Sequence, residues 1–458
     1  MRWHFIGIGG IGMSGLAQMA VRQGIEVTGS DRDSTRPENR RILDKLEAQG
    51  IRIYPQDGSF MRDSAPDKLI FSTAVEESNP DFAAGQGIGR LHRAEALDLL
   101  IRNGGFENVI AVTGSCGKST VTAYLAEALA NLGEDPDCLN GALCNRFRTG
   151  SFAGNYRPGN GKYFIFEADE SDKSLLRYNP DYALVLNIGT DHYDKAELRR
   201  VFGTFLQRVR KGAVLSSEVA ELISGCHPEL PKKVFASSVG GHGDCAVSRS
   251  DGKSAVFSDG GTLSLPQPGD HMALNALAVL AMLEILGVER AEALESLKVF
   301  QGVWRRFDAH GVTRAGAAVY DDYAHNPEKI TSALRAAQYV AKGNVYAVFQ
   351  PHGFGPLGFM REELLTVLQK NLRNGDRFLM LEPYYAGGTT SFKPTSLEVI
   401  SGCRESAGGE RFIHMPDRKI LAEYLLANAH SGDVILIMGA RDNSLSDFAA
   451  SLTTEKNT

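Results

Sequence analysis

The stretch that decides the fold is Gly114-Ser115-Cys116-Gly117-Lys118-Ser119-Thr120, which follows the apolar run VIAVTG (109–114) and leads into TVTAYLAEALANLG. A buried strand, a glycine-bearing turn with a lysine and a hydroxyl, and then a helix are typical of a phosphate-binding loop. The glycines let backbone N–H groups surround a phosphate, while Lys118 would contact the β- and γ-phosphates and Ser119 would bind Mg²⁺. We therefore predict that residues 114–120 bind ATP or GTP.

Two further expected strands end in groups suited to metal binding. The strand at 163–169 runs into Glu167-Ala168-Asp169-Glu170-Ser171-Asp172, and the strand at 182–189 runs into Asn187-Ile188-Gly189-Thr190-Asp191-His192. Ligands bind at the carboxyl ends of the strands in sheets of this kind, and carboxylate oxygens suit Mg²⁺. We expect Glu167 and Ser119 to bind one metal ion and His192 to bind a second.

A second glycine motif lies near the N-terminus. Gly7-Ile8-Gly9-Gly10-Ile11-Gly12 stands between strands expected at 3–8 and 25–29 and opens a helix, which is the context of a nucleotide-binding turn. The helix N-terminus would offer N–H groups to a diphosphate. Asp31 ends the second strand, where NAD enzymes hold a ribose, so the motif alone leaves NAD and UDP ligands open.

Length and composition fit three globular domains. The chain has 458 residues, and roughly 150 residues make a typical domain; 43% hydrophobic and 23% charged residues are ordinary for folded protein. We predict α/β domains at 1–105 (Rossmann-like), 106–308 (a phosphate-loop domain with a mostly parallel sheet) and 309–458 (Rossmann-like). Further strands are expected at 69–75 in the first domain and, in the third domain, within 317–324, 344–351, 377–383 and 433–439.

Charge, hydropathy and cysteine content narrow the class of protein. The net charge of -6 argues against nucleic-acid binding. The sequence contains no run of ~18 uninterrupted apolar residues, so we predict no membrane span. Glycines interrupt the apolar N-terminus, which we interpret as folded structure and not as a signal peptide. The six cysteines lack metal-site spacing, which favours reduced thiols in a cytoplasmic protein. We expect a monomer or a homodimer.

Further motifs complete a family pattern. His271 and Asn275 lie one turn apart on an expected helix, Arg305-Arg306 precedes the third domain, and Asp321-Asp322-Tyr323-Ala324-His325-Asn326-Pro327 follows a strand. Together with the loops above, and in this order, they resemble the Mur ligase family over essentially the whole chain. The motifs that carry the resemblance are HFIGIGGIGMSGLA, STAVEESNP, LHRAEAL, TGSCGKST, EADESD, NIGTDH, FQGVWRRFD, DDYAHNP and FQPH.

The resemblance implies an amide-forming ligase of peptidoglycan precursor synthesis that uses ATP and Mg²⁺. The carboxylate of UDP-N-acetylmuramate would attack the γ-phosphate to give an acyl phosphate and ADP, and the amine of an amino acid, L-alanine by default, would then displace phosphate. The resemblance implies catalytic roles for Lys118, Glu167, His192 and Arg306. It implies ATP contacts by His271, Asn275, Arg306, Asp322 and His325, and UDP-sugar contacts by Gly7, Gly9, Gly10, Gly12, Thr73 and Arg93.

The chain departs from the family at four places, one of which is Met438-Gly439-Ala440-Arg441-Asp442-Asn443 near the C-terminus. The phosphate loop reads GSCGKST where Thr, His and Thr are usual, and Met272 stands where Asn is common. After His352, alanine-adding members carry arginines that bind the acceptor carboxylate, whereas this chain reads Gly353-Phe354-Gly355-Pro356-Leu357-Gly358. A carboxylate without a paired cation binds poorly. We expect His352 and Arg441 to serve the amine substrate, and another amino acid, a peptide or another nucleotide-sugar stays open.

Two other classes of function stay open. A nicotinamide-dependent oxidoreductase would use the N-terminal glycine motif and Asp31 but would leave the phosphate loop unexplained. A non-catalytic nucleotide sensor would account for the missing arginines, but it has no need of Lys118, Glu167 and His192 together.

Overall fold

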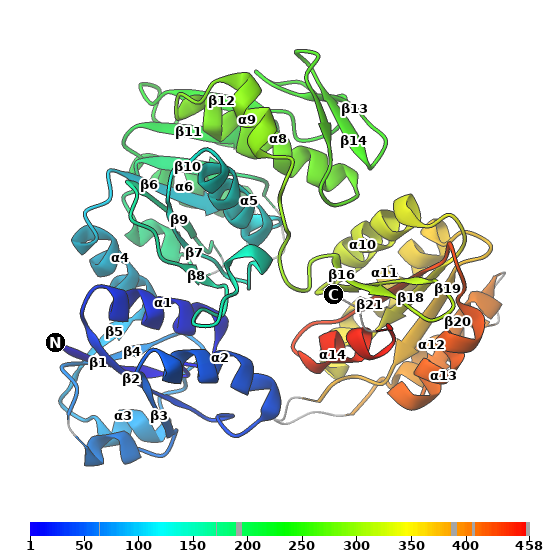
Figure 1. Ribbon diagram of the computed structural model, residues 1–458, viewed down its shortest axis with the longest axis horizontal. Helices are drawn as coiled ribbons and strands as arrows, with labels where there is room; N and C mark the ends of the chain where they lie inside the picture. The colour runs from blue at the N-terminus through cyan, green and yellow to red at the C-terminus, as the bar shows by residue number, and fades with distance from the viewer. Residues whose placement is uncertain (64, 171, 189–194, 386–391, 405–407, 455–458) are drawn as a thin grey trace. The chain divides into compact units, whose positions relative to one another are not determined.

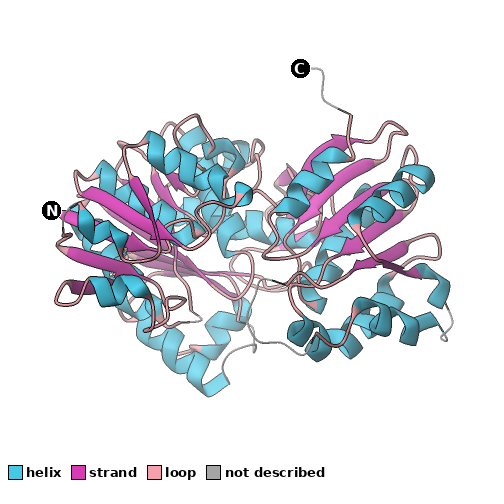
Figure 2. Ribbon diagram, turned by 90° about the horizontal axis from the view of Figure 1, so that it is seen from below, coloured by secondary structure: helices cyan, strands magenta, loops and turns pink. Residues whose placement is uncertain are grey.

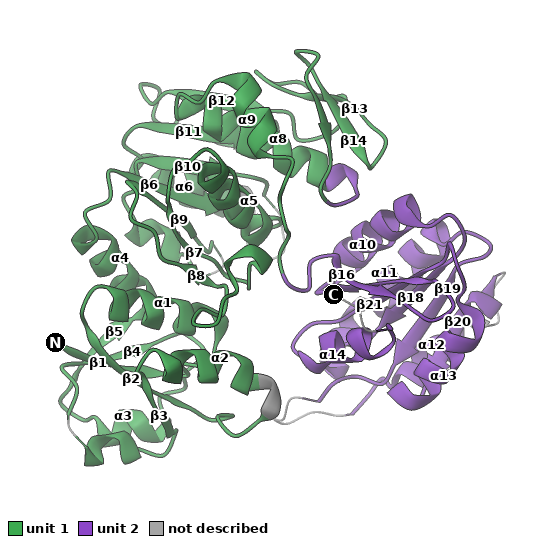
Figure 3. Cartoon of the chain, viewed as in Figure 1, with its two compact units in different colours: residues 1–266, 272–303 green, residues 267–271, 304–458 purple. Residues whose placement is uncertain are grey.

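The computed structural model describes residues 1–63, 65–170, 172–188, 195–385, 392–404 and 408–454. The chain divides into two compact units (Figure 3). The first unit comprises residues 1–266 and 272–303, and the second comprises 267–271 and 304–458. The predicted domain limits at 105 and 308 stay predictions.

The first sheet has five parallel strands in the order β3-β2-β1-β4-β5 (Figure 1). Its strands are β1 (Arg2–Ile6), β2 (Glu26–Asp31), β3 (Arg52–Pro55), β4 (Lys68–Phe71) and β5 (Gly89–His92). The helices that follow strands are α1 (Ile11–Arg22), α2 (Pro37–Ala48), α3 (Pro80–Ala84) and α4 (Arg93–Asn103). The strand order reverses at β1, and ligands of such sheets bind at the carboxyl ends beside the reversal. The N-terminal glycine motif lies at that edge, between β1 and α1.

The second sheet carries the phosphate loop and has the order β12-β11-β10-β6-β9-β7-β8. Its strands are β6 (Asn108–Thr113), β7 (Asp137–Leu139), β8 (Tyr156–Arg157), β9 (Tyr163–Glu167), β10 (Tyr182–Val185), β11 (Gly212–Ser216) and β12 (Lys232–Phe235). Only β8 pairs antiparallel within this sheet as described. The helices of this part are α5 (Lys118–Asn131), α6 (Lys195–Leu206), α7 (Ser217–Leu222), α8 (Asp270–Ile285) and α9 (Arg290–Ser296). Helices α5 and α8 share one apolar core with β6 and β9, which holds the phosphate loop on a rigid base.

A small antiparallel sheet follows the second sheet in the chain. It contains β13 (Val247–Ser250), β14 (Ser254–Phe257) and β15 (Thr262–Ser264). None of the predicted site residues lies on it.

The second unit has one six-stranded sheet in the order β16-β17-β21-β18-β19-β20, in which only the β16–β17 pair is antiparallel. Its strands are β16 (Asp308–Val312), β17 (Ala318–Asp322), β18 (Val345–Phe349), β19 (Arg377–Leu381), β20 (Phe412–Met415) and β21 (Val434–Met438). Its helices are α10 (Pro327–Val340), α11 (Phe354–Asn371), α12 (Ser396–Arg404), α13 (Arg418–Asn428) and α14 (Ser444–Ser451). Alternate residues of β18 and β21 face two separate cores, one with α10–α12 and the other with α13 and α14, so helices cover both faces (Figure 2).

Some predicted bounds differ from the structure. The strand expected at 69–75 ends at Phe71, and Thr73 lies in the exposed turn that follows. Strands β16 and β20 escaped prediction, because β16 contains a glycine and a register shift and β20 has only four residues. Among the helices of the described residues, none has the length and apolarity needed to cross a bilayer.

Candidate functional site

The phosphate loop joins β6 to α5, and the end of the neighbouring strand holds its backbone. Cys116 N donates to Asn187 Oδ1 (2.7 Å), and Asn187 Nδ2 donates to the Cys116 carbonyl (2.9 Å). Gly114 and Gly117 have φ of +130° and +86°, a backbone region that favours glycine. Every predicted loop residue thus lies in one turn and the start of α5: Gly114, Ser115, Cys116, Gly117, Lys118, Ser119 and Thr120.

The amino group of Lys118 is surrounded by acceptors. Its Nζ donates to the Gly114 carbonyl (2.7 Å) and to Glu170 Oε2 (2.9 Å), and Asp169 Oδ1 lies 4.0 Å away. Burial lowers the pKa of Lys118, but attraction to Glu170 and Glu167 outweighs it, and the pKa ends above its ordinary value. Lys118 is therefore a cation at neutral pH although only 14% of its side chain is exposed.

Ser119 and Glu167 meet at the carboxyl end of β9. Ser119 Oγ donates to Glu167 Oε2 (2.8 Å), and the same oxygen accepts from Gly141 N (3.0 Å). A hydroxyl and a carboxylate beside a phosphate loop are oxygen ligands of the kind that Mg²⁺ prefers, so these two residues fit the ion that the sequence predicts. Within the described ranges no group of three or more His, Cys, Asp or Glu side chains is arranged to hold a metal ion.

His192, the predicted ligand of a second metal ion, lies outside the described residues. The strand before it, β10, pairs in parallel with β6. That pairing brings Asn187, from the same sequence motif, to the phosphate loop.

Helix α8 passes beside the phosphate loop. A Cβ built on Gly117 would lie 3.1 Å from Asn275 Oδ1, so the Asn275 amide faces the turn. His271 is exposed in the first turn of α8. Met272 is 1% exposed and packs in the apolar core, so the residue that replaces the family's Asn is not presented to a ligand.

The N-terminal glycine motif closes around Asp31. Gly9 N donates to Asp31 Oδ2 (2.8 Å), and Asp33 N donates to Asp31 Oδ1 (2.9 Å). Both carboxylate oxygens of Asp31 thus accept hydrogen bonds from backbone N–H groups of nearby turns. The predicted diphosphate residues line the turn into α1: Gly7, Gly9, Gly10 and Gly12.

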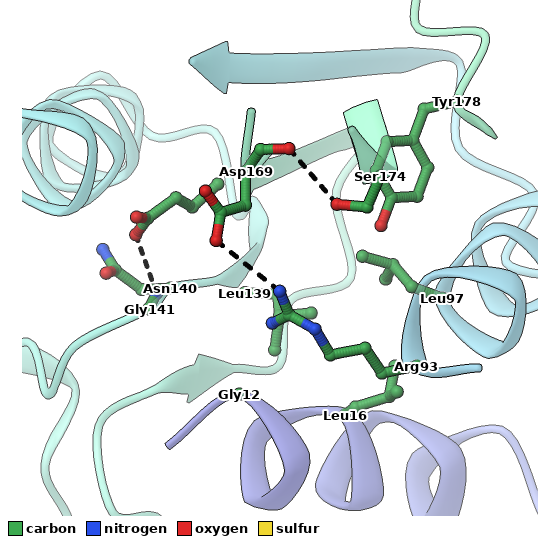
Figure 4. Close-up of a pocket in the computed structure, with 11 residues that line it drawn as sticks. Gly12, Leu16, Arg93, Leu97, Leu139, Asn140, Gly141, Asp169, Ser174 and Tyr178 are labelled. Atoms are coloured by element: carbon green, nitrogen blue, oxygen red, sulfur yellow. Dashed lines mark hydrogen bonds and ion pairs between the residues drawn. The ribbon is translucent and has the colours of Figure 1, made fainter. Parts of the chain in front are cut away.

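Arg93 connects this glycine turn to the acidic loop after β9. Its Nη2 lies 3.3 Å from Asp172 Oδ2 and 3.6 Å from Asp169 Oδ2, and a Cβ on Gly12 would lie 3.1 Å from its Nη1. Gly12, Arg93 and Asp169 line a cavity of about 220 Å³ (Figure 4), which Asn140, Gly141 and Glu167 also line. The first unit therefore brings two predicted sugar-binding residues, Gly12 and Arg93, to one cavity with the predicted metal ligand Glu167, whereas Thr73 does not line it.

In the second unit, the carboxylate of Asp322 accepts hydrogen bonds from two backbone N–H groups. Oδ2 accepts from Phe307 N and Oδ1 accepts from Ala324 N, both at 2.7 Å. Burial raises the pKa of Asp322, and the charge of Arg306 and these two N–H groups oppose that rise. Asp322 therefore fixes the backbone next to Arg306, whose guanidinium lies 5.3 Å from the centre of the Tyr323 ring.

Arg305, which sequence reasoning did not select, is 1% exposed. Its Nε lies 3.2 Å from both oxygens of Asp321, Nη2 donates to the Gly439 carbonyl (2.5 Å), and Nη1 donates to the Asp442 carbonyl (3.0 Å). Arg305 thus holds the segment that contains Arg441. The only signal in the sequence was its place beside Arg306.

His325, His352 and Arg441 come together in the second unit. The rings of His325 and His352 lie edge to face at 5.3 Å, and Arg441 N donates to Tyr323 Oη (3.3 Å). Burial lowers the pKa of His325 to about 4; its Nδ1 lies 2.9 Å from the Tyr323 carbonyl, which can only accept, so Nδ1 carries the proton. Burial and the nearby Arg441 lower the pKa of His352, whose buried Nδ1 has no hydrogen-bond partner among the described residues.

Asn140 is a further site residue, which sequence reasoning did not select. Asn140 Nδ2 donates to the Ser119 carbonyl (2.8 Å), so it holds the first turn of α5. Its only signal in the sequence is the Asn-Gly pair that ends the short apolar strand β7.

Family models match three successive parts of the chain. They are the Mur ligase family catalytic domain at 2–104, the Mur ligase middle domain at 112–283, and the Mur ligase glutamate ligase domain at 305–441.

Individual relatives match nearly the whole chain. The UDP-N-acetylmuramate–L-alanine ligase of Rhizobium meliloti is 32% identical over 472 aligned residues, covering 98% of this chain and 95% of the relative. The crystal structure of the UDP-N-acetylmuramate–alanine ligase of Thermotoga maritima is 27% identical, with a TM-score of 0.80 and 98% of each chain covered. A murein peptide ligase from Psychrobacter arcticus shares the fold at 23% identity, with a TM-score of 0.67 over 99% of this chain and 98% of that one. The chain belongs to the Mur ligase family of ATP-dependent acid–amine ligases.

Proposed function

We propose that this protein joins the carboxylate of UDP-N-acetylmuramate to the amine of L-alanine, with ATP as the energy source, in peptidoglycan precursor synthesis. The observation that carries the proposal is the cavity of about 220 Å³ where Gly12 and Arg93 face Glu167 and Asp169. The names of the relatives, at 32% and 27% identity, support the choice of substrates. ATP and nucleotide sugars are metabolites of the cytoplasm, where we expect the reaction.

Lys118 and the backbone amides of residues 114–120 would bind the phosphates of ATP, because a charged amino group lies at a glycine-bearing turn that leads into the N-terminus of α5. Ser119 and Glu167 would hold Mg²⁺, with His192 at a second ion; when bound, the ions offset the charge of the phosphate oxygens. Asn275 and His271 would contact adenine. Gly7, Gly9, Gly10, Gly12, Thr73 and Arg93 would bind the UDP-sugar.

The reaction would proceed in two displacements. The sugar carboxylate attacks the γ-phosphorus and ADP leaves, which forms an acyl phosphate. The neutral amine then attacks the acyl carbon, phosphate leaves, and the amine loses a proton to a base. Arg306 would meet the charge that develops on the transferred phosphoryl group, with Asp322 and His325 at the nucleotide edge. Burial lowers the pKa of both His325 and His352, so at neutral pH neither ring adds positive charge to this part of the second unit.

Phosphate release from ATP tests this function. The protein is incubated with UDP-N-acetylmuramate and a panel of free amino acids, short peptides or no amine. Release that needs both the sugar and L-alanine supports the proposal. Release that needs the sugar but prefers another amine points to a divergent member of the family with a different acceptor. Absence of sugar-dependent release contradicts the proposed substrates.

The acceptor carboxylate needs a cation, and we propose Arg441 for that role. No cation stands between His352 and Arg361 in the sequence, while Arg441 lies close enough to His352 to lower its pKa. Arg441→Ala should raise the KM for the amine at least tenfold, the usual size of a lost charge-assisted contact, with the KM for ATP unchanged. Arg361→Ala, on the exposed part of α11, is the control. An unchanged amine KM in Arg441→Ala excludes this role.

A further inference from the structure

A buried polar cluster holds the first turn of α1, directly behind the glycine motif. Asn155 Nδ2 donates to the Ile11 carbonyl (2.6 Å) and to Ser14 Oγ (2.7 Å), and Asn155 Oδ1 accepts from Gln18 Nε2 (3.1 Å). Asn155 and Ser14 are 0% exposed and Gln18 is 1% exposed. Each polar atom of the Asn155 amide group therefore has a partner on α1, as a buried amide requires.

The same asparagine is connected to the phosphate loop. The Asn155 carbonyl accepts from Asn140 N (2.8 Å), and Asn140 Nδ2 donates to the Ser119 carbonyl (2.8 Å). Asn140 also lines the cavity between the two predicted substrate sites. A continuous path of hydrogen bonds thus runs from Ile11, in the glycine turn, to Ser119, in the phosphate loop.

Apolar contacts alone would hold α1 against the second sheet without fixing its position along the surface, because they have no preferred direction. Hydrogen bonds to the amide of Asn155 are directional. They fix α1 at the turn where the sugar's diphosphate would bind. The opposite end of α1 has a separate contact, from Arg22 Nη2 to Asn160 Oδ1 (2.7 Å).

We propose that Asn155 is a positioning residue: it sets the separation of the glycine turn from the phosphate loop, and so the approach of the sugar carboxylate to the γ-phosphate. The inference rests on the proposed function. Asn155 touches neither substrate and acts through Ile11 and Asn140. A misplacement of about 1 Å costs on the order of 100-fold in rate, even where the substrates still bind.

The test compares Asn155→Ala with Asn160→Ala, since both remove an asparagine that bonds α1, one at each end. The dissociation constants of UDP-N-acetylmuramate and of a non-hydrolysable ATP analogue are measured by calorimetry, and kcat is measured by phosphate release. Asn155→Ala should lower kcat between 10-fold and 100-fold while each dissociation constant changes less than about threefold. Asn160→Ala should leave all three within about twofold.

An unchanged kcat in Asn155→Ala overturns the inference, as does a fall in kcat matched by equal losses of both affinities, which would mark a structural role. If Asn155→Ala does not fold, Ser14→Ala replaces it in the test, because it removes one acceptor of the Asn155 amide and leaves the bond to the Ile11 carbonyl. Ser14→Ala should lower kcat about threefold to tenfold. An unchanged kcat in this variant overturns the inference. Failure of the unsubstituted protein to bind the sugar would instead refute the proposed function.

Discussion

Lys118 combines burial with a retained charge, and this decides what its substitution should do. The residue lies between the Gly114 carbonyl and Glu170, so its amino group is held at the turn before any nucleotide arrives. A preorganised cation of this kind stabilises the charge that moves during phosphoryl transfer without further rearrangement.

Lys118→Met should therefore lower the rate of phosphate release at least 1000-fold, because the transition state loses its cation while the apolar stem keeps its packing. Affinity for UDP-N-acetylmuramate, measured by calorimetry, should stay within about threefold, since the predicted sugar contacts lie on the other sheet. Lys162→Met is the control; this lysine is 44% exposed and pairs only loosely with Glu134 at 3.6 Å. A large loss of sugar affinity in Lys118→Met would contradict the assignment of the two ligands to different sheets.

At the scale of the residue, the sequence allowed us to predict site residues that belong to short motifs with a defined spacing. Lys118, Ser119 and Glu167 belong to short motifs next to recognisable strands, and the structure places them together. The contacts of Asn155 and Arg305 were not predictable, because most of their partners lie far away in the sequence and a single asparagine or arginine carries no periodic signal. The roles of the predicted residues stay predictions.

At the scale of the element, helix α5 extends from the phosphate loop to the segment that leaves the first unit. Glu127 on this helix is 0% exposed, and its Oε2 accepts from Gln301 N (3.0 Å). Arg146 Nη1 lies 3.9 Å from that oxygen. Burial raises the pKa of Glu127 to about 7, although both of these partners act to lower it. The helix that begins at the nucleotide site thus carries a titrating carboxyl group at its contact with residue 301.

The pKa of Glu127 predicts a pH dependence of stability. Between pH 4.5, its ordinary pKa, and about 7, the folded protein keeps a proton that the unfolded chain releases, so the free energy of unfolding falls as pH rises and then levels off. The total effect is at most about 3 kcal/mol. Glu127→Gln keeps an acceptor for Gln301 and removes this dependence; at pH 8 it should be more stable by about 1–3 kcal/mol.

Urea unfolding from pH 4.5 to 8 measures this, with the exposed Glu134→Gln as the control. An identical pH slope in Glu127→Gln and in the unsubstituted protein would show that another group is responsible.

Strands with a continuous apolar pattern could be predicted from the sequence, whereas short strands and strands at the edge of a sheet could not. The buried strands β6, β18 and β21 are continuous apolar runs, and the structure has them where the sequence places them. β20 has four residues, and the pairing of β16 shifts register between Ala309 and Gly311, so neither strand gives a clear period. The predicted strand at 69–75 was too long because the apolar pattern does not register the turn after Phe71.

At the scale of the whole molecule, the predicted chemistry requires more than one unit. The phosphate loop belongs to the first unit, whereas Arg306, His352 and Arg441 belong to the second. We therefore predict that the molecule becomes more compact when an ATP analogue and UDP-N-acetylmuramate bind together. Small-angle scattering should show a lower radius of gyration with both ligands than with either one. No change with both ligands present would contradict a reaction centre shared by the units.

The pairing of Lys118 with Glu170 bears on which anions the protein admits. Before a nucleotide arrives, the strongest cation of the loop is already neutralised by a neighbouring carboxylate. A stray inorganic phosphate or sulfate would have to displace Glu170 and leave that carboxylate exposed to another negative charge, which is unfavourable. A polyphosphate accompanied by its own divalent cation supplies a new partner for the displaced acidic groups. Small anions and a metal-bound nucleotide would therefore meet the same carboxylate at Lys118, and only the nucleotide would bring a cation of its own.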